Sequence, residues 1–375
     1  MPRRRSTLAS LLALAYGLLV VYASLYPFSG WRWPLASFPQ FLALPWPRWW
    51  QGFDVAANLL GYLPLGALLF VAQLRRGQGV HLPLLLGVLI PGALSFAMET
   101  FQHLLPARVP SLADWVLNTA GAALGVLLAL MVHALGGLER WETLRDRWFV
   151  SASEGGVALL LLWPVGLLFP TPMPLGLGQV ASLWSGIREG LATMLEGTPW
   201  QFGVLSDASM AVAEVGRALP PGLEALAIAL GVVAPCVVAL AVAMPGWRKL
   251  GLVLGASALG VSVTALSTAM SFGPQHALAW MTGPAVVGLG LGSLAAILLC
   301  WLPARMVAAL GLVSITTLIA LVNMAPPNPY FSQNMASWEQ GQFIRFHGVA
   351  QWVGWLWPFV ALAWLLVRVS RRDRH

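Results

Sequence analysis

Long apolar runs separated by short polar segments repeat along the whole chain. A helix of about 20 apolar residues crosses a hydrocarbon core of about 30 Å. Each long run is therefore expected to be a transmembrane helix. The pattern predicts about ten of them, at residues 7–27, 54–74, 82–104, 112–135, 153–171, 222–245, 249–270, 283–302, 305–324 and 348–369. The expected fold is an all-α, polytopic integral membrane helical bundle.

Composition and charge support this interpretation and set the expected topology. The 375 residues are 58% apolar and only 9% charged, whereas a soluble domain carries about 25% charged residues. With the N-terminus in the cytoplasm, 15 of the 21 basic residues fall in cytoplasmic segments, as the positive-inside rule requires. Both termini are therefore expected to be cytoplasmic. The net charge of +7 is explained by topology, and nucleic acid is not an expected partner.

A charged segment between the fourth and fifth predicted spans divides the chain. Residues 136–152 carry mixed charge at helical spacing, which predicts a cytoplasmic surface helix. The expected organisation is a four-helix membrane domain at 1–135, this linker, and a six-helix membrane domain at 153–375. Long outer loops are expected at 28–53, 172–221 and 325–347, and the second could hold short amphipathic helices at 179–197 and 203–218. No internal repeat is visible, which argues against an inverted-repeat transporter.

Six polar residues interrupt the apolar pattern of spans two to four. A charged side chain at the centre of a bilayer costs roughly 3 kcal/mol or more, so such residues are rare and often functional. The expected topology brings all six to the outer leaflet, with Ser111 or a neighbour as the N-cap of the fourth span. They are Asn58, Glu99, Gln102, Arg108, Asp114 and Asn118.

The polar cluster has two interpretations. In the functional one, Arg108 binds an anionic group through its planar fork, and Glu99 or Asp114, the catalytic candidates, moves a proton or orients a partner. Asn58, Gln102 and Asn118 then hold the geometry. In the structural one, the polar side chains bond helices to one another, and Arg108 with Asp114 clamps a loop.

Other polar and cysteine residues suggest less. Arg345 and His347 enter the last span from outside and could face an anionic headgroup, although a snorkelling arginine and an interfacial histidine would look the same. Cys236 and Cys300 lie in apolar spans and are expected to pack as small hydrophobes. No histidine or cysteine spacing indicates a metal site, and no cofactor is expected.

Glycines recur four residues apart in several predicted spans. Such pairs allow close helix packing in membranes, which is the expected role of three pairs: Gly121 with Gly125, Gly251 with Gly255, and Gly288 with Gly292.

The polar cluster resembles the VanZ-like family of bacterial membrane proteins over about residues 6–135. The family pattern has four elements in this order, and the chain carries them as Asn58-x-x-x-x-x-Pro64-x-Gly66, Glu99-x-x-Gln102, Arg108, and Asp114-x-x-x-Asn118-x-x-Gly121. One departure is Tyr62, where the family often has Phe. The resemblance implies a protein of the bacterial cytoplasmic membrane, in a family named for resistance to glycopeptide antibiotics, notably teicoplanin. It implies a site but no reaction.

Together these features predict a cell-envelope protein that acts at the outer leaflet. Its expected partner is a membrane lipid or a lipid-linked envelope molecule, which it binds or alters, with an effect on teicoplanin susceptibility. Two alternatives stay open: a lipid-modifying enzyme that uses Glu99, Asp114 and Arg108, and a transporter or flippase. Whether the protein is an enzyme is therefore left open.

Overall fold

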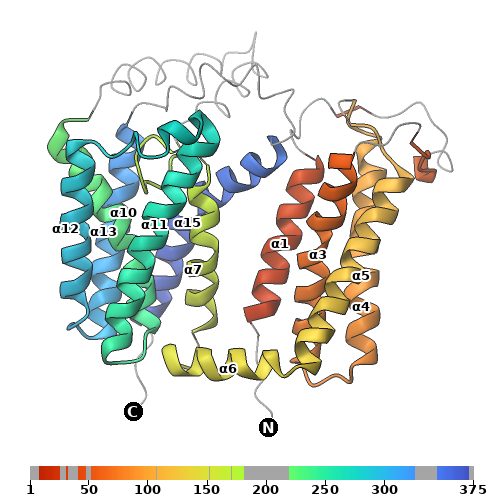
Figure 1. Cartoon of the computed structure of the whole chain (residues 1–375), viewed down its shortest axis with the longest axis horizontal. Helices are drawn as coiled ribbons and strands as arrows, with labels where there is room; N and C mark the ends of the chain where they lie inside the picture. The colour runs from red at the N-terminus through yellow and green to blue at the C-terminus, as the bar shows by residue number, and fades with distance from the viewer. Residues whose placement is uncertain are drawn as a thin grey trace, which may run out of the picture. The chain divides into compact units, whose positions relative to one another are not determined.

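The computed structural model describes residues 8–25, 31–32, 41–47, 52–106, 108–151, 153–169, 171–180, 219–325 and 344–370. Within these ranges the regular structure is helical (Figure 1). The chain forms two compact units, Met1–Arg147 and Trp148–His375, and each is described by itself below.

The first unit contains four long apolar helices and one polar helix. The apolar helices are α1 (Leu8–Leu25), α3 (Gly52–Leu74), α4 (His81–Gln102) and α5 (Leu112–Ala134), and each is long enough to cross a membrane. The polar helix α6 (Gly137–Trp148) has no buried residue, as expected for a surface helix. Arg75, just after α3, forms an ion pair of 3.1 Å with Glu142 of α6. This contact puts the basic residues after α3 and the charged helix at the same end of the unit.

Glycines bring α3 and α5 into direct backbone contact. A Cβ added at Gly66, Gly121 or Gly125 would overlap the carbonyl of Ala122, Leu59 or Leu63 on the other helix. Only a residue without a side chain fits at these three positions, so the expected packing role of Gly121 and Gly125 is confirmed.

The second unit is organised around one buried helix. Its helices are α7 (Glu154–Leu167), α10 (Pro221–Val242), α11 (Trp247–Phe272), the short η1 (Pro274–His276), α12 (Gly283–Leu299), α13 (Ala304–Met324) and α15 (Ile344–Ser370). In α10, 89% of the apolar window is buried. Gly288 and Gly292 of α12 pack against the backbone of α10, as expected, but nothing lies within 4 Å of a Cβ at Gly255. The packing role expected of Gly255 is therefore wrong, because that position does not face a neighbouring helix.

A described helix coincides with each of the ten predicted spans. Eight are long and apolar enough to cross a membrane, while α7 and α12 are shorter, with 14 and 17 residues. The chain is therefore an all-α, multi-pass membrane helical bundle. The cytoplasmic location of the termini and the boundaries of the two predicted membrane domains stay predictions.

The fifth predicted span differs most from expectation. It was expected to reach residue 171, followed by an outer loop, but α7 ends at Leu167. Residues 171–180 instead form a non-helical segment inside the second unit, where Met173, Leu175 and Leu177 are buried. The sequence places Pro170, Pro172 and Pro174 directly after this end, and proline lacks the N–H of a helix hydrogen bond, so the helix cannot continue.

Side-chain and backbone groups of other helices form hydrogen bonds with the backbone of this buried segment. Asn323 of α13 donates from Nδ2 to the carbonyl of Gly178 and accepts from the N–H of Val180, both at 2.9 Å. The N–H of Gly178 donates to the carbonyl of Gly354, also at 2.9 Å. Non-helical backbone at membrane depth is tolerated where protein surrounds it in this way.

Two further expectations fall largely outside the described residues. The proposed amphipathic helices lie almost wholly within residues 181–218, which are not described, and residues 179 and 180 are not helical. Most of the loop expected at 325–347 also lies outside the described part, and the last helix begins at Ile344.

Candidate functional site

The acid of α4 and the start of α5 form one hydrogen-bonded unit. Glu99 is only 5% exposed, and its Oε2 accepts a hydrogen bond of 2.9 Å from the backbone N–H of Ser111. Ser111 is the N-cap of α5, and its Oγ accepts from the N–H of Asp114 at 3.3 Å. Glu99 therefore binds a backbone donor that the helix itself cannot satisfy. This confirms Ser111 as the cap and gives Glu99 a positioning role at the start of α5.

Two other residues of the cluster hold the end of α1. Nε2 of Gln102 donates to the carbonyl of Ser24 at 3.1 Å, and Nη2 of Arg108 donates to the carbonyl of Ala23 at 3.4 Å. Carbonyls in the last turn of a helix have no partner within it, so both side chains cap α1. The sequence did not suggest this contact, because nothing in the spacing links residue 102 or 108 to the first span.

Asn118 lies deeper, between α4 and α5. It is 4% exposed, and its Nδ2 donates a bond of 2.9 Å to Oγ of Ser95, which is fully buried. Its other polar atom, Oδ1, is buried without a hydrogen-bond partner. A buried acceptor without a hydrogen bond costs about 1–3 kcal/mol.

Tyr62 of α3 presents a second buried polar atom of the same kind. Its hydroxyl lies near Ser24, Ser95 and Glu99, yet it has no partner in hydrogen-bonding geometry in the described part of the chain. By contrast, Tyr16 of α1 donates its hydroxyl to the carbonyl of Gly61 at 3.0 Å. The polar cluster thus contains two buried polar atoms without a hydrogen-bond partner, on Tyr62 and Asn118.

Three residues of the predicted cluster are less deeply placed. Asn58, Arg108 and Asp114 are half-buried, whereas Glu99, Gln102 and Asn118 are buried. The cluster therefore has a buried part that is largely engaged with backbone and a half-buried part that a ligand could reach.

Sequence reasoning missed two members of this arrangement, Tyr62 and Ser95. The sequence marks Tyr62 only as a departure from the family pattern, and its polar pattern does not single out Ser95. Helical spacing could have found both, because Tyr62 is four residues after Asn58 and Ser95 is four residues before Glu99, so each pair shares a helix face.

The other predicted residues belong to the second unit. Arg345 and His347 belong to α15 in the second unit, and their side chains lie outside the described part of the structure. Cys236 is buried and Cys300 is half-buried, both as free thiols. Among the described residues, no group of three His, Cys, Asp or Glu could hold a metal ion.

Comparison with known proteins assigns the first unit. The family model described as VanZ/LLP1 matches residues 9–133, a range that runs from α1 nearly to the end of α5. No curated protein and no solved structure matches the chain. The matched range contains every residue of the polar cluster and the three glycines that join α3 to α5. Residues 9–133 therefore match the VanZ/LLP1 family, and the chain is a multi-pass membrane protein with a VanZ-like domain in its first unit.

Proposed function

We propose that the VanZ-like unit binds the polar group of a membrane lipid or of a lipid-linked envelope molecule, at the outer face of a bacterial cytoplasmic membrane. The observation that carries the proposal is the pair of buried atoms without partners, Oδ1 of Asn118 and the hydroxyl of Tyr62. Buried polar groups in proteins are almost always hydrogen-bonded, to protein or to another molecule. Two such atoms among apolar helices mark a place that another molecule completes.

The half-buried residues supply the contacts of this site. Arg108 provides a cation beside the end of α1, suited to a phosphate or carboxylate. Asp114 and Asn58 offer hydrogen-bonding groups at the starts of α5 and α3. The buried Glu99 and Gln102 fix the ends of the helices that carry them.

The packing of α3 on α5 favours binding over transport. Passage of a polar molecule between these helices would require them to separate where Gly66, Gly121 and Gly125 hold their backbones in contact. The site then serves molecules that enter from one face of the membrane, and an envelope molecule at the outer leaflet fits this geometry. An effect on teicoplanin susceptibility follows if that molecule is part of the antibiotic's route to the cell wall.

A lipid-modifying enzyme is the second candidate, because the Tyr62 hydroxyl lies near the Glu99 carboxylate. Such a pair could move a proton during reaction at a bound headgroup. The two functions differ in their products: an enzyme changes the lipid composition of the cell, whereas a binding protein does not.

The test is complementation of a deletion strain, scored by teicoplanin susceptibility and by mass spectrometry of whole lipids. Arg108→Ala, Asp114→Asn and Glu99→Gln are compared with wild type at equal membrane levels. Asp54→Asn is the control, because Asp54 is exposed in the first turn of α3. Loss of function in the three site variants with unchanged lipids supports binding, and accumulation of one lipid species supports the enzyme. Wild-type behaviour of all three variants contradicts the proposal.

A further inference from the structure

The second unit contains a pocket that is separate from the VanZ-like unit. It has a volume of about 510 Å³, within the range of about 300–1,000 Å³ typical of small-molecule sites. It lies where α7 and α11 end and α10 begins, and the non-helical segment after α7 contributes Thr171, Pro172 and Pro174 to its lining. Broken helices and irregular backbone line substrate sites in other membrane proteins.

The backbone next to this pocket is held in a costly conformation. Leu175 follows the lining residue Pro174 and has a φ of 63°, in the left-handed region that an L-residue with a side chain rarely adopts. Leu175 is also 2% exposed and packs against Gly231 and Gly260. Such residues persist only where the surrounding structure enforces them, and they cluster at ligand sites.

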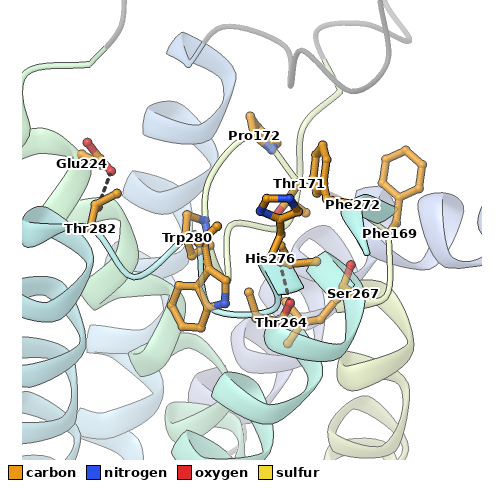
Figure 2. A pocket seen from close by; sticks show the side chains of 14 residues that line it. Phe169, Thr171, Pro172, Glu224, Thr264, Ser267, Phe272, His276, Trp280 and Thr282 are labelled. Carbon is orange, nitrogen blue, oxygen red and sulfur yellow. Dashed lines mark hydrogen bonds between the residues drawn. The ribbon is translucent and has the colours of Figure 1, made fainter. Parts of the chain in front are cut away.

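Two buried polar atoms at the pocket have no partner. Oγ1 of Thr264 and Nε1 of Trp280 are buried without a hydrogen bond in the described part of the chain, and both residues line the pocket. Thr264 itself is 9% exposed. In Figure 2 the side chains of Thr264 and Trp280 lie in the lower part of the view, below Thr171 and Pro172. The indole N–H can only donate, so its partner must be an acceptor.

Most other polar groups of the pocket present acceptor oxygens. The hydroxyls of Thr171, Ser267 and Thr268 donate to the backbone carbonyls of Met173, Leu168 and Thr264, at 2.5, 3.0 and 2.9 Å. The hydroxyl oxygens of Ser267 and Thr268 keep lone pairs that can accept a hydrogen bond. A ligand that carries N–H or O–H donors is therefore complementary to this wall.

The charge of the pocket favours a cation. Glu224 lies in the first turn of α10, where the helix dipole favours a carboxylate, and it accepts a hydrogen bond of 3.4 Å from Thr282. The described residues that line the pocket include no lysine or arginine, and one histidine, His276. Figure 2 shows Glu224 and Thr282 at one end, and the rings of Phe169 and Phe272 at the other.

We propose that this pocket binds an organic ammonium that carries a neutral hydrogen-bond acceptor and a short apolar body. The ammonium pairs with Glu224, the acceptor takes the N–H of Trp280, and the apolar body lies against Phe272 and the prolines. A free amine and the ethanolamine headgroup of a lipid share the ammonium that would pair with Glu224. The proposal is independent of the function assigned to the VanZ-like unit.

The test uses the full chain in nanodiscs of phosphatidylglycerol, which has no ammonium. Binding of radiolabelled 2-phenoxyethylammonium, which has an ether acceptor between ring and ammonium, is measured by scintillation proximity. Unlabelled 2-phenoxyethanol and phenoxyacetate serve as neutral and anionic competitors of the same shape. A second set of nanodiscs contains phosphatidylethanolamine, whose headgroup would compete if the site takes a lipid.

The expected result is saturable binding of the labelled ammonium, which the neutral and anionic analogues displace only weakly. Glu224→Gln should weaken it by about tenfold or more, because it removes a charge-assisted bond. Trp280→Phe keeps an aromatic ring without the N–H and should weaken binding by about threefold to tenfold. Glu154→Gln removes the same charge at the opposite end of α7 and should leave binding unchanged.

If phosphatidylethanolamine competes with the probe, the ligand is a lipid headgroup. If it does not compete, the ligand is a free amine. Either result supports the pocket as an ammonium site. Three results would overturn the proposal: no saturable binding in phosphatidylglycerol nanodiscs, equal competition by 2-phenoxyethanol, or equal affinity of wild type and Glu224→Gln. Variants of the first unit such as Arg108→Ala should bind the probe normally. A failure here is therefore distinguishable from a failure of the proposed function.

Discussion

The carboxylate of Glu99 on α4 accepts the backbone N–H of Ser111, the residue that caps α5, at 2.9 Å. The bond joins two helices across the short connection between them. It gives the buried carboxylate a donor and gives the N–H at the start of α5 an acceptor. An acid in a membrane helix can therefore hold the start of a neighbouring helix, whether or not it also binds a ligand.

Glu99→Leu should destabilise the protein more than Glu99→Gln does. Gln keeps an acceptor for the Ser111 N–H, whereas Leu leaves that buried donor without a partner, at a cost of about 1–3 kcal/mol. The free energy of unfolding in detergent micelles, measured by chemical denaturation, checks the order. A leucine variant as stable as the glutamine variant would show that the bond does not hold α5.

Gly66→Ala should destabilise the protein by about 1–3 kcal/mol, since overpacking a tight contact forces the backbone to shift. Its Cβ would overlap the carbonyl of Ala122 on α5. The matched control is Gly61→Ala on the same helix, where nothing lies within 4 Å of the added Cβ. Thermal unfolding of both variants measures the difference. Equal effects would mean that α3 and α5 are not in backbone contact.

Asn323→Leu should loosen the buried segment 171–180. The variant leaves the carbonyl of Gly178 and the N–H of Val180 without their side-chain partner. Amides of this segment should exchange hydrogen faster in mass spectrometry than in wild type, because local opening becomes less costly. Thr316→Val, at an exposed position of the same helix, should leave exchange unchanged. Unchanged protection in Asn323→Leu would contradict the role of Asn323.

Two tyrosine variants should change stability in opposite directions. Tyr62→Phe removes a buried hydroxyl without a partner and should stabilise the ligand-free protein by about 1 kcal/mol. Tyr16→Phe removes a hydroxyl that bonds Gly61 and should destabilise it by a similar amount. Unfolding of delipidated protein in micelles compares them. Destabilisation by Tyr62→Phe would indicate that its hydroxyl already has a partner.

Hydropathy predicts the helices well because a helix is the simplest way to satisfy backbone groups in lipid. It predicted a helix at each of the ten spans. The expected topology also places six polar residues together at the outer leaflet; the structure joins Glu99 to the start of α5, and the membrane level stays a prediction. It could not predict the segment 171–180, because apolar residues such as Leu175 and Leu177 have the same hydropathy in a helix and in an extended chain. Partners distant in sequence supply its hydrogen bonds.

The sequence predicts which residues belong to the site better than it predicts their hydrogen-bond partners. The residue types and spacing singled out Gln102 and Arg108, but their bonds to Ser24 and Ala23 depend on how α1 packs. Tertiary packing also decides which glycines contact another helix: Gly121 does, and Gly255 does not. The same spacing occurs at both, so a periodic pattern alone does not separate them.

The most direct test of the proposed site is lipid binding by purified protein, measured by native mass spectrometry on wild type, Tyr62→Phe and Tyr16→Phe. Protein extracted from its native membrane is expected to retain an envelope lipid in wild type and in Tyr16→Phe, and to lose most of it in Tyr62→Phe, where the unpartnered hydroxyl is gone. Equal retention by all three proteins, or no retained lipid in wild type, would contradict the account.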